Sequence, residues 1–209
     1  MKKAFCRIIV LILMCITLIS CSFTKGNTTS EIKQTVNKFV HAIKTGNIEE
    51  FVNIANPYGI LVIRNYITGG YGLRGKNIRN FYKPNEISSG LIFPVDGELP
   101  VKLSELFHST VQLGGKINNI KKLKGIYFTN KREYIQYNNI PSTKEIVNRI
   151  YKILNKAGKN YETPAIYVLD NDEFLLCEAK IINSLPVGSF VLFKKLKGDY
   201  KVIAVIDLK

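Results

Sequence analysis

The stretch AIYVLDNDEFLLCEAKIINSLPVGSFVLFKKLKGDYKVIAVIDL, residues 165–208, decides the fold. Its apolar runs are rich in β-branched and aromatic residues, which favour strands. The turn signals between them are Asn171-Asp172, Gly198-Asp199 and a looser Leu185-Pro186-Val187-Gly188. Because short turns join antiparallel neighbours, this stretch predicts an antiparallel meander. Its four strands are expected at Ala165–Leu169, Phe174–Ile182, Ser189–Leu196 and Tyr200–Leu208.

Closer to the N-terminus the apolar spacing is that of helices. One helix of about fifteen residues is expected to end at Gly46, and Asn47 can cap a second over Ile48–Ala55. A third helix is expected to begin at Pro141-Ser142 and end at Gly158. The stripe of the first helix is Ile32, Val36, Phe39, Val40 and Ile43; that of the third is Ile146, Val147, Ile150, Tyr151 and Leu154.

Between these parts we expect strands at 59–68 and 77–82, an irregular stretch at 84–100, a short helix at Leu103–Val111 and strand-like residues at 126–137. The composition, 46% hydrophobic and 22% charged, is that of a globular protein. Together these patterns predict one α+β domain over residues 30–209, with N-terminal helices packed on a curved antiparallel sheet.

The N-terminus, MKKAFCRIIVLILMCITLISC, has a basic start and a twelve-residue apolar run, Ile8–Ile19, as secretory signal peptides do. The run ends in Leu18-Ile19-Ser20-Cys21, which resembles the lipobox of bacterial lipoproteins. The resemblance implies that residues 1–20 are removed and that Cys21 carries the lipid. The alternative is an uncleaved signal anchor in which Cys21 is an ordinary thiol.

By this reading the protein is held at the extracytoplasmic face of the cell membrane, with residues 21–29 as a tether. The processed chain keeps 27 of its 30 basic residues against 16 acidic ones, a net charge of about +11. Such a charge favours anionic lipids or wall polymers as partners. An envelope protein is a further possible partner, whereas no nucleic-acid motif is present.

Two helices followed by a curved antiparallel sheet resemble the nuclear transport factor 2-like cone fold. Ala42–Phe51 (AIKTGNIEEF) looks like that family's joint between helices, and Lys197–Ile203 (KGDYKVI) looks like its last hairpin, with Tyr200 where Trp is common. The resemblance implies that residues near 115–160 form a helical insertion. It also implies an interior that holds a ligand or is plugged by side chains. No catalytic residue can be transferred to this chain.

The best ligand-binding candidates lie between Phe51 and Asn85, a stretch without acidic residues in which basic and aromatic side chains alternate. Such a mixture suits an anionic sugar polymer, a lipid headgroup or an acidic protein. Half-buried aromatics on one strand face and solvated charges on the other would give the same pattern. The candidates are Arg64, Tyr66, Tyr71, Arg74, Lys76 and Arg79.

Two further patterns are less specific. Gly70–Asn77 (GYGLRGKN) matches the start of a phosphate-binding loop, but Asn77 stands where Ser or Thr would hold Mg²⁺, so a tight turn explains it as well. A second basic run is either a solvated loop or a surface that lies on anionic headgroups. It comprises Lys116, Lys121, Lys122, Lys124, Lys131 and Arg132.

No residue pattern identifies catalysis. His41 is expected to be exposed, His108 has no paired carboxylate or nucleophile in the sequence, and Cys177 is expected to be a buried, inert thiol. Asp170 and Asp172 fit a turn. Zinc-protease, thiol-redox and serine-hydrolase motifs are missing, so neither a cofactor nor a metal is expected. The sequence favours a non-catalytic binding module, with a pocket-bearing cone that binds or converts a small molecule as the alternative.

Overall fold

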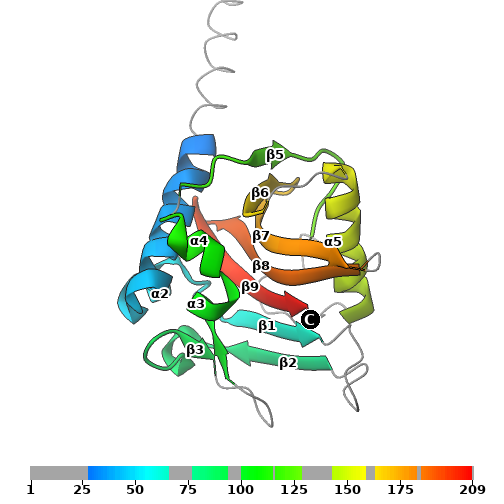
Figure 1. The fold of residues 1–209 in the computed structure, drawn as a ribbon. Helices are drawn as coiled ribbons and strands as arrows, with labels where there is room; N and C mark the ends of the chain where they lie inside the picture. The colour runs from blue at the N-terminus through cyan, green and yellow to red at the C-terminus, as the bar shows by residue number, and fades with distance from the viewer. Residues whose placement is uncertain are drawn as a thin grey trace, which may run out of the picture.

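A computed structural model describes residues 28–65, 77–93, 100–114, 116–128, 143–158, 163–182 and 185–208. The fold is α+β, as the sequence predicts, with helices on a mostly antiparallel sheet (Figure 1). Seven strands of the described chain form this sheet in the order β2-β1-β9-β8-β7-β6-β5. They are β1 (Ile60–Asn65), β2 (Asn77–Tyr82), β5 (Ile120–Lys122), β6 (Ala165–Val168), β7 (Glu173–Ile182), β8 (Leu185–Leu196) and β9 (Asp199–Leu208).

The meander β6-β7-β8-β9 is antiparallel throughout, as predicted. Two pairings in the sheet are parallel. Strand β1 lies beside β9, with Leu61 opposite Ala204, and the edge strand β5 lies beside β6. A separate small sheet pairs β3 (Ile92–Phe93) with β4 (Val101–Lys102).

The predicted loose turn at residues 185–188 is wrong, because these residues extend β8 and pair with β7. Strand β9 begins to pair with β8 only at Gly188, so Pro186 has no partner in β9. Proline is tolerated at this position because no neighbouring residue of β9 requires the backbone N–H that proline lacks. Gly188 has φ +143°, and a Cβ at this position would lie 2.4 Å from the Glu178 carbonyl oxygen. Only glycine fits at this point of β8.

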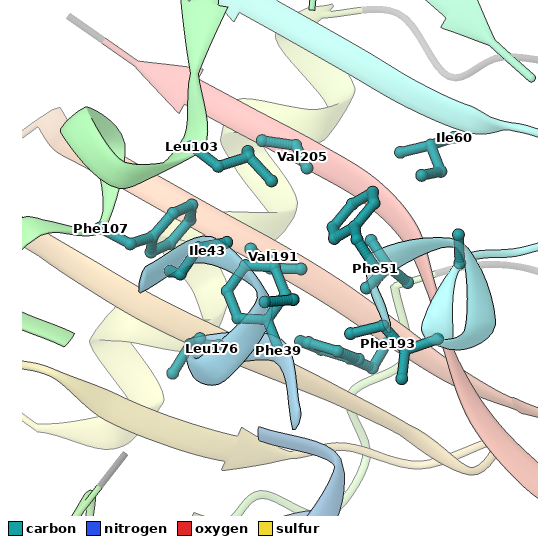
Figure 2. Packing of buried hydrophobic residues seen from close by; sticks show 14 of the residues in the cluster. Phe39, Ile43, Phe51, Ile60, Leu103, Phe107, Leu176, Val191, Phe193 and Val205 are labelled. Atoms are coloured by element: carbon teal, nitrogen blue, oxygen red, sulfur yellow. The ribbon is translucent and has the colours of Figure 1, made fainter. Parts of the chain in front are cut away.

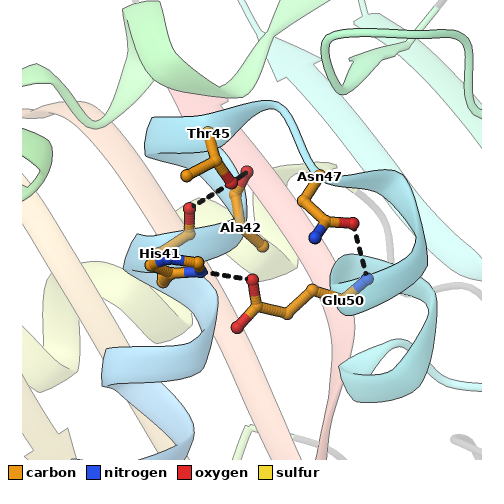
Figure 3. Close-up of polar contacts among 5 residues, drawn as sticks. All are labelled: His41, Ala42, Thr45, Asn47 and Glu50. Atoms are coloured by element: carbon orange, nitrogen blue, oxygen red, sulfur yellow. Dashed lines mark hydrogen bonds and ion pairs between the residues drawn. The ribbon is translucent and has the colours of Figure 1, made fainter.

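The first helix occupies residues 28–45, and its predicted stripe is fully buried against the sheet. It ends at Gly46, which has φ +67°. Asn47 then caps α2 (Ile48–Ile54), since its side chain accepts a hydrogen bond from the Glu50 N–H at 3.1 Å (Figure 3). The predicted helix end at Gly46 and the predicted cap at Asn47 are therefore confirmed.

The segment predicted as one short helix at 103–111 forms two, α3 (Leu103–Leu106) and α4 (His108–Gln112). Phe107 separates them with φ −116° and ψ 44°, outside helical values. Its side chain is fully buried in the core, so the break places an aromatic ring under the helical layer. A 3₁₀ helix, η1 (Pro84–Glu86), lies in the stretch predicted to be irregular.

Helix α5 (Thr143–Ala157) has nearly the predicted bounds and covers the opposite face of the sheet. Ile146, Ile150, Ile153 and Leu154 of this helix are buried in a second core with Leu175, Leu192 and Ile206 of the sheet. The sheet therefore separates two hydrophobic cores, whereas the sequence predicted only a layer of N-terminal helices packed on it. Of the strand-like residues predicted at 126–137, those described, 126–128, form no strand, and the rest lie outside the described residues.

The first core, between the N-terminal helices and the sheet, is filled by aromatic rings (Figure 2). Phe193 stacks on Phe174 with centroids 4.3 Å apart and meets the edge of Phe39 at 5.6 Å. Phe39 also contacts Phe107 edge-on at 5.7 Å. These four rings are completely buried. Phenylalanine side chains thus fill the space between the N-terminal helices and the sheet.

Candidate functional site

The assignment of Arg64 to a ligand site required an exposed side chain, but Arg64 does not lie on the surface. Its side chain is only 6% exposed, and its Nε lies 3.3 Å from a carboxylate oxygen of Asp207, which is 2% exposed. Residues 60, 62 and 64 share one strand face, so the arginine follows Ile60 and Val62, which belong to the first core. Arg64 therefore belongs to a buried ion pair that joins β1 to β9.

The other candidates from the same stretch lie mostly outside the described residues. The backbone of Arg79 belongs to β2, opposite Ile63. Tyr66, Tyr71, Arg74 and Lys76 are not described, and neither is the glycine-rich loop up to residue 76. The predicted basic and aromatic site thus stays a prediction for these residues, without Arg64.

Arg64 belongs to a row of polar residues that crosses four strands, which we call the polar row; Arg64, Asp207 and Ser189 are buried and Glu178 is half-buried. Arg64 is opposite Asp207, Asp207 is opposite Ser189, and Ser189 is opposite Glu178. Two positions away on each strand a parallel row is wholly apolar and lies in the first core: Val62, Val205, Val191 and Leu176. The polar row therefore marks the boundary at which the first core ends.

Glu178 connects this row to the helical layer. Its carboxylate accepts hydrogen bonds from the N–H groups of Ser109 and Thr110 at 2.8 and 3.1 Å and from the Thr110 hydroxyl at 2.9 Å. Backbone N–H groups in the first turn of a helix have no partner within the helix. Glu178 thus supplies the cap of α4 from a distant strand, and Thr110 is completely buried by it.

A second buried ion pair lies on the opposite face of the sheet. Lys194 Nζ is 3.0 Å from Glu173 Oε1, with side chains 5% and 0% exposed. The other carboxylate oxygen of Glu173 accepts the N–H of Phe128 at 2.7 Å. Arg149 of α5 in turn donates to the Phe128 carbonyl. This pair ties the loop after β5, and through it α5, to the central strands.

The histidines have local partners. His41 is exposed, as predicted, and lies next to the Glu50 carboxylate at the joint between the first two helices (Figure 3). His108, also exposed, lies beside the side-chain nitrogen of Gln112 at 2.7 Å. These contacts are explained by helix spacing and joint geometry, so neither histidine forms a catalytic arrangement with the described residues.

Cys177 is completely buried in the second core, as predicted. Burial raises the pKa of its thiol well above the ordinary value. Tyr200 behaves in a similar way: burial, with the carboxylates of Asp172 and Glu31, raises its pKa to about 12. Both groups therefore remain protonated at neutral pH.

We expect Cys177 to react with a maleimide in the native protein at least about 1,000-fold more slowly than in urea, because labelling requires opening of the core. The measurement uses the chain from residue 21 onward with Cys21→Ser, in which Cys177 is the only thiol. A native rate within tenfold of the unfolded rate would show that this core opens readily.

Lysines gather along the β5 edge of the sheet, and we call them the basic edge: Lys33, Lys116, Lys121, Lys122, Lys124 and Lys156. Lys33 of the first helix and Lys116 line one surface hollow of about 530 Å³. The Lys156 ammonium of α5 donates to the Lys124 carbonyl. The acidic Asp170 also lies here, and its carboxylate accepts the Gly125 N–H at 2.7 Å.

The basic edge lies beside the start of the first helix. The first helix, drawn in blue, begins at its end close to β5 (Figure 1). Nearby, Glu31 is paired with Lys195 of β8 at 2.6 Å, so its charge is offset locally. Between Glu105 and Glu133 the sequence contains no acidic residue. The basic edge therefore carries an excess of positive charge.

Within the described ranges, no group of three or more His, Cys, Asp or Glu side chains is arranged to hold a metal ion. The helices in those ranges are all too short or too polar to span a membrane. Comparison with known proteins gives no match to a family model, a curated protein or a solved structure.

Proposed function

We propose that this chain is a lipoprotein anchored through Cys21 at the extracytoplasmic face of the cell membrane, whose folded part binds a partner through its surface. The anchor is supported by the basic start, the apolar run and the lipobox-like Leu18-Ile19-Ser20-Cys21. The surface mode of binding is supported by one observation above all: fully buried phenylalanines fill the first core. A filled interior favours a binding module over the alternative of a pocket that takes a small molecule.

We also propose that the fold is related to the nuclear transport factor 2-like cone, in a plugged form. The helix–Gly-Asn–helix joint at Gly46 and Asn47 supports this, as does the antiparallel meander with a register shift at Leu192 and Phe193. The insertion implied near 115–160 would then be α5 with the loop before it. In such a relative, function depends on the outer surface.

Lipid attachment is tested by growing a bacterium that processes lipoproteins on an alkyne-bearing fatty acid while it expresses the full chain. We expect the protein to take up the label and to partition with membranes. The variant Cys21→Ser should lose all label, because it removes the lipobox cysteine, whose thiol receives the lipid. Cys15→Ser is the matched control and should label like the unchanged protein. Label that persists in Cys21→Ser would refute the anchor.

A further inference from the structure

We propose that the basic edge docks on the anionic headgroups of a lipid bilayer and so fixes which face of the domain is turned towards the membrane. The orientation rests on the proposed Cys21 anchor, whereas the attraction of the basic edge for headgroups does not. Its exposed members are Lys33, Lys116, Lys122, Lys124 and Lys156, and Lys121 is half-buried among them.

The first argument is charge. The six lysines of the basic edge come from the first helix, the loop after α4, strand β5, the loop after β5 and helix α5. Asp170 lies among them, and its carboxylate is engaged by a backbone N–H. An anionic leaflet attracts clusters of four to eight basic residues held close to it. The basic edge meets this requirement with side chains that the fold holds together.

The second argument is reach. Six residues lie between Cys21 and Thr28, so even a fully extended chain spans at most about 25 Å over these seven Cα–Cα steps. Lys33 follows about 8 Å further along the helix. An anchored chain therefore keeps the start of the helix close to the bilayer, with the basic edge beside it. Headgroup attraction acts within about 10 Å at 0.1 M salt, a gap that the tether allows the domain to close.

The short tether also favours lipid over a wall polymer as the occupant, because it holds the basic edge beside the bilayer. A different explanation is that Lys121 and Lys122 protect an exposed strand edge from pairing with another chain. Glutamate protects an edge by the same means, whereas it repels an anionic leaflet. Charge inversion therefore separates the two explanations.

The test uses the chain from residue 21 onward with Cys21→Ser, which contains both cores and cannot be acylated. Binding is measured by co-sedimentation with vesicles of phosphatidylcholine containing 30% phosphatidylglycerol. The variant Lys116→Gln/Lys122→Gln/Lys124→Gln removes three charges, and we expect its partition coefficient to fall roughly 100-fold. The corresponding triple glutamate variant should fall further.

The matched control is Lys44→Glu/Lys83→Glu/Lys102→Glu, at exposed lysines away from β5. It makes the same charge change as the triple glutamate variant of the basic edge. We expect it to lose less than about threefold. Thermal unfolding of each variant establishes that it is folded. Binding should vanish on pure phosphatidylcholine and weaken in 0.5 M NaCl.

Three results would overturn the docking proposal: unchanged binding in the basic-edge variants, an equal loss in the control, or binding of the unchanged protein to purified wall polymer but not to vesicles. The fatty-acid labelling of Cys21 is independent of these results. A failure of docking and a failure of the anchor can therefore be told apart.

Discussion

Lys194→Met is expected to lower the free energy of unfolding by about 3–5 kcal/mol, because it leaves the Glu173 carboxylate buried without its cation. Glu173 is completely buried, and Lys194 is the cation that lies 3.0 Å from it. Since a domain of this kind is stable by only about 5–15 kcal/mol, the variant should unfold at much lower urea concentrations. Circular dichroism during urea unfolding measures the change.

A second substitution isolates the charge. In Lys194→Met/Glu173→Gln the carboxamide is neutral and its oxygen can still accept the Phe128 N–H, so most of the loss should be recovered. Asp199→Asn is the surface control, because that side chain is 80% exposed and 4.0 Å from Lys201. It should change stability by less than about 0.5 kcal/mol. A cost below about 1 kcal/mol for Lys194→Met would mean that water reaches Glu173.

Phe193→Ala is expected to cost about 3–5 kcal/mol, the usual range for removing a buried aromatic ring. Phe193 stacks on Phe174 and meets Phe39 edge-on, so the substitution leaves a cavity in the middle of the first core. Phe193→Leu keeps much of the volume and should cost less than half as much. Leu113→Ala, at a side chain that is 46% exposed, is the control and should cost less than about 1 kcal/mol.

The same variant tests whether the first core is a plug or a pocket. A dry cavity left by Phe193→Ala should bind a small apolar molecule such as benzene, which would raise the midpoint of thermal unfolding. The unchanged protein should show no such shift, because its rings fill the space. A loss of less than 1 kcal/mol, or a benzene shift in the unchanged protein, would favour the pocket-bearing alternative.

Local pattern was sufficient to predict most elements. The stripe of the first helix, the cap at Asn47, the end of α5 before Gly158 and the four C-terminal strands all depend on residues close in sequence. The errors came from longer-range effects. Residues 185–188 look like a turn, yet they form strand because they pair with β7, and Pro186 has no partner in β9. Phe107 breaks a helix because the core needs its ring.

The polar groups were harder to predict than the elements. Arg64 and Asp207 each lie near the end of an apolar strand, 143 positions apart in the sequence, and nothing in either segment identifies the other as a partner. The parallel pairing of β1 with β9 brings them together. The same holds for Glu178, whose role as the cap of α4 depends on contacts across 68 and 69 residues.

The pairing of β1 with β9 also has a consequence for how the chain reaches its native state. Strand β1 follows the two N-terminal helices, yet its inner neighbour is the last strand of the described chain. Contacts of such high sequence separation close large loops before they gain energy, which slows folding. During synthesis Phe39 and Phe51 have no complete surface to pack against until β9 has emerged. An incomplete chain therefore exposes its N-terminal apolar surface, and the domain can complete its folding only after the last strand has been synthesised.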